Sequence, residues 1–264
     1  MKIMITGYKG FIGQNMVNAL KHEHDIVLYD WGQPFPSLSG LDWIIHLGAI
    51  SSTTETDVEK ILKQNYDFTC MLLVACQMEK VNLQYASSAS VYGPTQEFTE
   101  DGPVFPQSPY AWSKYLFDRV SVSQTYKDIV VQGFRYFNVY GDHEDHKGNQ
   151  ASPYTKFAKQ AKEKGVIELF EGSENYLRDF IHVNEVVEIH KTFFNVKESG
   201  IWNVGTGKPR SFEAVAREVA EQYDAVIKYI PMPDNVKNQY QAYTRADVSK
   251  LRKYYNNNNT TVNN

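Results

Sequence analysis

The chain lacks the features of a secreted, membrane-spanning or nucleic-acid-binding protein. It has only two cysteines, Cys70 and Cys76, which lie six residues apart on different faces of one predicted helix, so buried thiols are favoured over a disulfide. No run of 18 apolar residues occurs, and Met1 leads directly into a predicted strand, which predicts neither a membrane span nor a signal peptide. We therefore expect a cytoplasmic protein.

The chain also lacks a strong overall charge. Its formal net charge is −4, which gives no basic field for binding nucleic acid or an anionic membrane. With 264 residues, of which 42% are hydrophobic, it can bury one large core, or a nucleotide-binding domain with a smaller companion. We expect neither nucleic acid nor a membrane among its partners.

A phosphate-binding turn follows the first predicted strand. The segment 2–6 predicts a buried strand, and Gly7, Gly10 and Gly13 open a helix predicted to continue to about Lys21. Glycines at this spacing allow a tight turn, close approach of the backbone to a pyrophosphate, and close packing of helix on strand. The pattern predicts a dinucleotide site.

An acidic residue supports the same prediction. Asp30 ends a second predicted strand, residues 25–29, where a carboxylate accepts hydrogen bonds from ribose hydroxyls and repels a 2′-phosphate. No Lys or Arg occurs between Lys21 and Lys60. The expected cofactor is NAD or NADP, and both observations favour NAD.

Tyr110 and Lys114 carry the most specific chemistry in the sequence. They lie four residues apart on one face of a helix predicted to run to about Thr125, so the phenol and the ammonium can reach the same ligand. A free phenol has a pKa of about 10, and a cation beside it favours the phenolate, which makes Tyr110 a candidate proton acceptor. Ser88 ends an apolar segment that begins at Gln84, which predicts a strand with Ser88 at the carboxyl end of a sheet.

Together with the glycines, these three residues resemble the catalytic set of the extended short-chain dehydrogenases/reductases, the NAD-dependent epimerase/dehydratase group that modifies nucleotide sugars. The resemblance covers nearly the whole chain. It implies an α/β enzyme with a Rossmann-type doubly wound parallel sheet in residues 1–140, to which the chain returns around residues 180–206. Residues 141–264 are expected to form mainly a smaller substrate-binding region with a polar C-terminal tail. A homo-oligomer is expected.

Two segments depart from this group. Residues 31–41 hold two prolines and no periodicity before a strand predicted at residues 42–46, where relatives normally have a helix and another strand with residues that hold the adenine. We therefore predict that one βα unit is missing, that the sheet lacks an outer strand, and that adenine is held less tightly or by other groups. At the other end, residues 246–255 predict a short helix where relatives usually continue with one more.

The resemblance also assigns a cofactor site. It includes the turn at residues 47–51, the helix predicted from residue 57 to 79, and the end of a strand predicted at residues 129–137. The group usually has Asn where Gln64 stands. The expected cofactor-binding residues are Gly7, Gly10, Phe11, Ile12, Gly13, Asp30, Trp31, Leu47, Gly48, Ala49, Ile50, Ser51, Gln64, Tyr110, Lys114 and Val139.

Six further motifs lie at residues 51–55, 145–148, 169–180, 202–207, 229–231 and 240–242. They narrow the resemblance to the ADP-L-glycero-D-manno-heptose 6-epimerases. In that group the residue at Lys147 is a second acid/base, beside Tyr110. Hydride leaves C6 of the heptose and must return to the opposite face; C6 lies outside the ring, so rotation about the C5–C6 bond presents either face, and each orientation needs its own proton partner. Which of the two residues removes the first proton stays open.

The same resemblance assigns a sugar-nucleotide site. Arg178 is the expected diphosphate partner, because a planar guanidinium matches phosphate oxygens. Asn149 and Lys156 stand where Ser and His are common. Ser88 is expected to donate a hydrogen bond to the substrate oxygen. The expected substrate-binding residues are Ser88, Asn138, Asn149, Lys156, Phe170, Glu171, Gly172, Ser173, Arg178 and Tyr240.

Two other functions stay open. Another nucleotide-sugar epimerase, such as a UDP-hexose 4-epimerase, or a reductase would use the same catalytic residues. A non-catalytic NAD(P)-sensing protein of this fold would tend to lose Tyr110 or Lys114, and both are present. No metal is predicted, because His143 and His146 have no further nitrogen or sulfur ligand at a suitable spacing.

Overall fold

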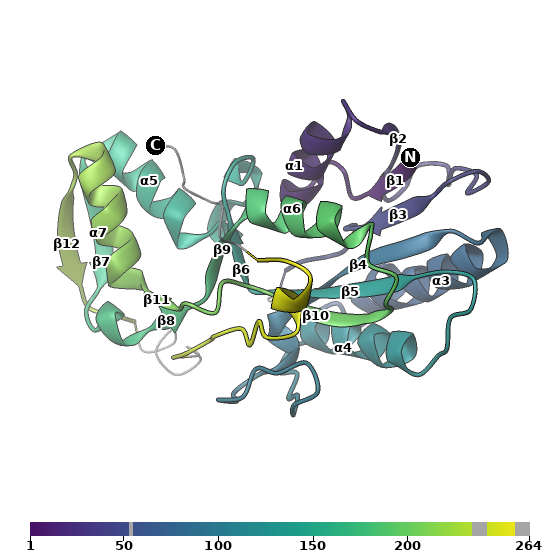
Figure 1. Ribbon diagram of the computed structural model, residues 1–264. Coiled ribbons are helices and arrows are strands. Elements are labelled where there is room, and N and C mark those ends of the chain that lie inside the picture. Colours follow the sequence, from purple (N-terminus) through teal and green to yellow (C-terminus); the bar gives the residue numbers. More distant parts are fainter. Residues whose placement is uncertain (53–54, 234–241, 257–264) are drawn as a thin grey trace.

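The computed structural model describes residues 1–52, 55–233 and 242–256 (Figure 1). A six-stranded parallel sheet lies at its centre, in the order β10-β5-β4-β3-β1-β2. The predicted α/β fold is confirmed. The strands of this sheet are β1 (Lys2–Thr6), β2 (Asp25–Tyr29), β3 (Trp43–His46), β4 (Asn82–Ser88), β5 (Val131–Tyr136) and β10 (Gly200–Val204).

Helices cover both faces of the sheet. On one face α1 and α6 share a core with Ile3 and Ile5 of β1, and on the other face Met4 shares a core with α3 and α4. Successive side chains of a strand point to opposite faces, so a strand that is covered on both sides is apolar throughout. The bounds are α1 (Phe11–Leu20), α3 (Phe68–Glu79), α4 (Pro109–Val122) and α6 (Val183–Phe193).

Residues 31–41 form neither helix nor strand, and β2 is an edge of the sheet, as predicted. Leu38 and Leu41 are buried in the core beside α3, and the ring centroid of Phe35 lies 5.9 Å from that of Phe68. The segment therefore covers this flank with individual apolar side chains instead of a helix.

The second part of the chain forms a smaller layered unit beside the sheet (Figure 1). Helices α5 (Pro153–Lys164) and α7 (Phe212–Tyr223) share a core with the parallel strands β7 (Val166–Phe170) and β12 (Val226–Ile230). Two pairs of short strands complete this unit: β6 (Asn138–Tyr140) pairs with β9 (Phe180–His182), and β8 (Leu177–Arg178) pairs with β11 (Arg210–Ser211).

Several predicted elements differ in their bounds. The helix predicted for residues 57–79 is divided by a π-helical segment, so that α2 (Val58–Ile61), η1 (Leu62–Asp67) and α3 follow one another. Helix α4 ends at Val122, with Ser123 as its C-cap. The helix predicted for residues 246–255 is wrong: Val248 packs into the core from irregular backbone, and the segment contains only the 3-10 turn η5 (Leu251–Lys253).

Three further 3-10 turns are η2 (Ala89–Val91), η3 (Asp145–Gln150) and η4 (Ser173–Asn175). In the part of the chain that the structure describes, every helix is too short or too polar to cross a bilayer.

Candidate active site

A cavity of about 550 Å³ lies where β1, β3 and β4 end. This is the edge at which open parallel α/β sheets bind their ligands. Thirteen predicted residues line it: Gly7, Gly10, Phe11, Ile12, Gly13, Asp30, Leu47, Gly48, Ala49, Ser51, Tyr110, Lys114 and Lys147.

The glycine turn at the base of this cavity leaves no room for side chains. Gly7 has a φ of +68°, and a Cβ there would lie 2.5 Å from the Cα of Gly48. A Cβ on Gly13 would lie 2.2 Å from the carbonyl oxygen of Gly7. Without side chains, the turn leaves its backbone open to a phosphate group at the N-terminus of α1. The free amides and the dipole of this helix favour a negative charge there.

Asp30 lines the same cavity directly after β2. Its Oδ1 accepts a hydrogen bond from the amide of Trp31 at 2.9 Å, and its own amide donates to the Oε1 of Gln33 at 2.8 Å. The Gln33 side chain in turn donates to the hydroxyl of Tyr8 in the glycine turn at 3.4 Å. Trp31 is 47% exposed and lies outside the cavity lining.

The turn at residues 47–51 is held in place by Asn65. The Oδ1 of Asn65 accepts from the amide of Ile50 at 2.8 Å, and its Nδ2 donates to the carbonyl of Ile50 at 3.0 Å and to the Oγ of Ser113 at 3.1 Å. Gln64, which the sequence favoured, does not line the cavity. Both residues lie in the π-helical segment η1, and only Asn65 is buried there.

Ser88, Tyr110 and Lys114 meet beside the end of β4. Lys114 donates from its Nζ to the carbonyl of Ala86 at 2.8 Å, and this Nζ lies 6.0 Å from the ring centroid of Tyr110. The hydroxyl of Ser88 hydrogen-bonds with the phenol of Tyr110. The hydroxyl of Ser108 caps α4 by accepting from the amide of Ala111 at 3.2 Å, which fixes the start of the helix that carries two of the three groups.

One electrostatic expectation is wrong. Burial raises the pKa of Tyr110 above its usual value, and the hydrogen bond with Ser88 opposes this, while Lys114 makes no resolved contribution. Burial also lowers the pKa of Lys114 to about 8, and Asp118 opposes that shift. Desolvation therefore outweighs the attraction between the ammonium and a phenolate at this separation.

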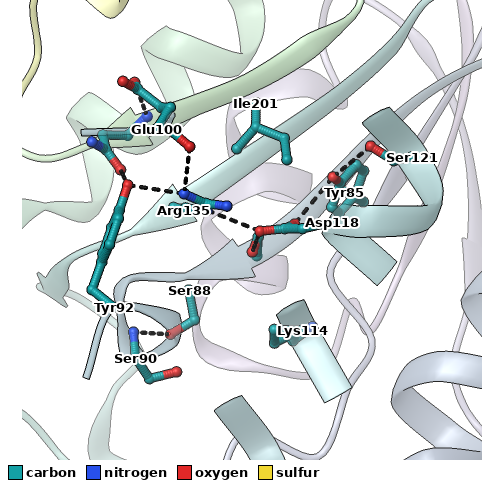
Figure 2. A network of polar contacts seen from close by, with 12 residues as sticks. Tyr85, Ser88, Ser90, Tyr92, Glu100, Lys114, Asp118, Ser121, Arg135 and Ile201 are labelled. Carbon is teal, nitrogen blue, oxygen red and sulfur yellow. Dashed lines mark hydrogen bonds and ion pairs between the residues drawn. The ribbon is translucent and has the colours of Figure 1, made fainter. Parts of the chain in front are cut away.

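A buried polar network lies behind these residues (Figure 2). The carboxylate of Asp118 accepts from the hydroxyl of Tyr85 at 3.1 Å, the hydroxyl of Ser87 at 2.9 Å and the Nε of Arg135 at 2.9 Å. The guanidinium of Arg135 also donates to the hydroxyl of Tyr92 at 3.1 Å. The network joins α4 to β4 and β5 and thus fixes the strand that ends in Ser88 relative to the helix that carries Tyr110.

Lys147 approaches the cavity from η3. Its Nζ lies 5.3 Å from the ring centroid of Phe11, the first residue of α1, and burial lowers its pKa. Lys147 and Tyr110 therefore face one cavity from two separate elements, η3 and α4.

A second cavity, of about 350 Å³, lies between α5, β7 and α7. Lys156, Phe170 and Ser173 line it, whereas Glu171 and Gly172 do not. Two predicted positions fall outside the described residues, Tyr240 and the side chain of Asn149.

Three further predicted residues lie on the short strands β6 and β8. Asn138 on β6 donates to the carbonyl of Asp179 at 3.3 Å, and Val139 follows it on the same strand. The guanidinium of Arg178 lies 5.6 Å from the ring centroid of Phe212, which lines the second cavity.

Sequence reasoning missed Tyr136, which lines the first cavity. Its hydroxyl lies 2.6 Å from the Nε2 of His190, whose Nδ1 lies 2.7 Å from the Oε1 of Gln84. The Nε2 of Gln84 donates to Gln132, so its oxygen accepts from His190 and the phenol of Tyr136 donates to His190. Strand β5 is buried throughout, so its pattern carries no signal that one side chain would face a ligand.

Comparison with known proteins agrees with this geometry. A model of the NAD dependent epimerase/dehydratase family matches residues 30–205, more than half of the chain. The chain belongs to this family. The resemblance seen in the sequence motifs is therefore confirmed, and the protein is an enzyme of the NAD dependent epimerase/dehydratase family.

Three relatives show where in the family the chain lies. It is 40% identical to the ADP-L-glycero-D-manno-heptose-6-epimerase of Brachyspira hyodysenteriae (strain ATCC 49526 / WA1), over 95% of this chain and 90% of that protein. The crystal structure of the Helicobacter pylori ADP-L-glycero-D-manno-heptose-6-epimerase has a TM-score of 0.84 and 28% identity, covering 96% of this chain and 89% of the other. The Thermus thermophilus UDP-glucose 4-epimerase, solved in complex with NAD, has a TM-score of 0.79 and 26% identity, covering 97% and 94%.

Proposed function

We propose that this family member inverts C6 of an ADP-activated glycero-manno-heptose. The observation that carries the proposal is the placement of Tyr110 and Lys147 in one cavity above the glycine turn, on separate elements. The relative with 40% identity and the Helicobacter pylori structure, both named as enzymes of this activity, support it.

The cavity offers what a nicotinamide dinucleotide needs. The glycine turn and the N-terminus of α1 would hold the pyrophosphate, Asp30 the adenosine ribose, and Lys114 the nicotinamide ribose. When bound, the cofactor supplies one chemical function, the removal and return of a hydride at C6. Of the other predicted cofactor residues, Trp31, Ile50, Gln64 and Val139 stay predictions.

The protein's own groups move the protons. Ser88 would donate a hydrogen bond to the C6 oxygen, and either Tyr110 or Lys147 would take the hydroxyl proton as the C–H bond breaks, which leaves a ketone. Rotation about C5–C6 then turns the oxygen toward the other residue. That residue donates a proton to the oxygen as the hydride returns to the opposite face, so the product differs from the substrate only in configuration.

The second cavity would take the nucleotide end of the substrate. Phe170 offers an aromatic surface, Ser173 a hydroxyl and Lys156 a cation, and Arg178 lies close enough to its wall at Phe212 to meet the diphosphate. Asn138, Asn149, Glu171, Gly172 and Tyr240 complete the proposed substrate site on the strength of the resemblance.

Three further expectations are also proposals. We infer that the protein prefers NAD because of Asp30, that the chain divides into two domains near residue 140, and that the protein is located in the cytoplasm. We also propose a homo-oligomer, because Met71, Val74 and Met78 expose one apolar face of α3. Trp112 and Val122 of α4 are exposed as well. A second copy would cover such a face with its own equivalent.

The test is direct. The purified protein is incubated with ADP-D-glycero-D-manno-heptose, the two C6 epimers are resolved, and the small molecules released on denaturation are identified by mass spectrometry. Interconversion of the epimers supports the proposal. Interconversion of UDP-hexose C4 epimers alone would assign the alternative specificity, and bound dinucleotide without turnover of either substrate would favour the sensing function.

A further inference from the structure

Glu144 is a buried acid that neither the catalytic set nor the substrate site uses. Its side chain is 2% exposed, and three donors occupy its two oxygens: the amide of Ser152 at 2.7 Å, the hydroxyl of Ser152 at 2.6 Å and the hydroxyl of Thr155 at 2.6 Å. Ser152 is the N-cap of α5. Buried carboxylates are rare and are found where every oxygen is satisfied, so this arrangement fixes Glu144 firmly to the start of α5.

The same residue also holds the backbone of the Lys147 segment. The carbonyl of Glu144 accepts from the amide of Lys147 at 3.0 Å. At the other end of this segment, the Nζ of Lys147 lies over the ring of Phe11. Glu144 thus connects α5 to the turn that carries Lys147 to the glycine loop.

The charge of Glu144 acts on two lysines that belong to different cavities. Burial lowers the pKa of Lys147 and of Lys156, and Glu144 raises both. Lys147 lines the first cavity and Lys156 the second. Four other titratable residues line the first cavity: Tyr110 and Lys114 of α4, Asp30 after β2, and His146 on the same turn as Lys147. None of them is among the causes that shift the pKa of Lys147.

Neither lysine is bound by this carboxylate. Among the described residues, no ion pair within 4.0 Å joins Glu144 to Lys147 or Lys156. A carboxylate that neutral donors already occupy supplies negative potential in a poorly solvated place without capturing the ammonium. Lys147 therefore keeps its proton available to a substrate, and Lys156 can meet a phosphate or a base.

We propose that Glu144 is a positioning residue for epimerisation: locked by Ser152 and Thr155, it sets the turn that carries Lys147 and supplies both Lys147 and Lys156 with a negative charge that binds neither. This inference rests on the proposed function, since it gives Lys147 a proton to move and Lys156 a nucleotide to hold.

The test compares Glu144→Gln with Asp145→Asn. The glutamine keeps the size of the side chain and an oxygen for the Ser152 amide, and hydroxyl groups can reverse to accept from its NH₂. Asp145 is exposed on the same turn, so its variant removes a neighbouring charge that solvent screens. Lysines are reductively methylated with ¹³C, the signal of Lys147 is assigned by its absence in Lys147→Arg, and its titration is followed by NMR alongside the pH dependence of kcat and KM.

We expect the titration midpoint of Lys147 and the limb of the kcat profile that it governs to move to lower pH in Glu144→Gln, with a higher KM, while Asp145→Asn follows the wild type. An unmoved titration in a folded Glu144→Gln protein would overturn the inference. If that variant does not fold, Glu144→Asp decides: it keeps the charge but shortens the side chain that reaches Ser152 and Thr155. A wild-type titration of Lys147 with reduced kcat supports the inference, and an unchanged kcat contradicts it. The NMR titration of Lys147 needs no turnover. A wild type that fails to epimerise would therefore overturn the proposed function, while the titration would still test the effect of Glu144 on Lys147.

Discussion

The ammonium of Lys114 donates to the carbonyl oxygen of Ala86 at 2.8 Å, which ties the catalytic helix to the strand that ends in Ser88. The side chain is 7% exposed, and burial lowers its pKa to about 8. Lys114 is therefore held as a charged group at a place where charge is costly.

The buried charge of Lys114 lowers the stability of the folded protein, and we expect Lys114→Met to restore that stability. The folded pKa of about 8 lies below the usual 10.5, so the folded state binds its proton less tightly than the unfolded chain does, and the penalty is complete below about pH 8 and gone above 10.5. We expect Lys114→Met to lose epimerase activity yet to be more stable at pH 7, by at most about 3 kcal/mol. Denaturant unfolding at pH 7 and pH 10 checks this, and an advantage that does not shrink at the higher pH would contradict it.

Removing the carboxylate of Asp118 should destabilise the protein strongly. Arg135 would then keep a buried charge without its partner, since both side chains are at most 4% exposed, and breaking such a pair costs about 3–5 kcal/mol. Asp128→Asn serves as the matched control, because Asp128 is 66% exposed and its pair with Lys80 spans 3.9 Å. Urea unfolding compares the two variants, and equal midpoints would mean that the network contributes little.

Asp30→Asn should weaken the discrimination against NADP. The amide keeps a hydrogen-bond acceptor for the ribose but no longer repels a 2′-phosphate, a repulsion of about 1–4 kcal/mol for charges about 4 Å apart. The ratio of NADP affinity to NAD affinity should rise roughly 5-fold or more. Titration calorimetry with both cofactors measures it, and Asp25→Asn, exposed at the start of β2, should leave the ratio unchanged.

A charge on the apolar face of α3 should disrupt the proposed oligomer. Met78 is 77% exposed and Val74 54%, and both would be covered by a second copy. We expect Val74→Glu/Met78→Glu to lower the mass measured by light scattering with chromatography to that of a single chain. Glu79→Lys, one residue along the same helix, is the control for a charge change alone. A wild type that elutes as a single chain would remove the proposal.

Local patterns were predictable from the sequence because their geometry is local. Gly7, Gly10 and Gly13 need no distant partner to form a turn, and the spacing of Tyr110 and Lys114 places them on one helix face wherever the helix lies. The absence of regular structure at residues 31–41 likewise followed from two prolines and no periodicity.

Properties that depend on tertiary packing were not predictable. The pKa of Tyr110 depends on burial by distant segments. The π-helical segment η1, which contains the Asn65 that binds Ile50, has no signature in its composition. Strands as short as β8 and β11 exist only because each pairs with the other across more than thirty residues. Glu144 stood in a run of charges that reads as surface, and only the fold reveals its three donors.

The most direct test of the central claim follows the hydrogen at C6 when the epimers are interconverted in D₂O. A hydride that is carried on the cofactor between leaving C6 and returning to it does not exchange with solvent, whereas a proton removed by Tyr110 or Lys147 from carbon would. The account predicts that mass spectrometry finds both epimers without deuterium on carbon at equilibrium. Deuterium at C6 of the product would contradict it.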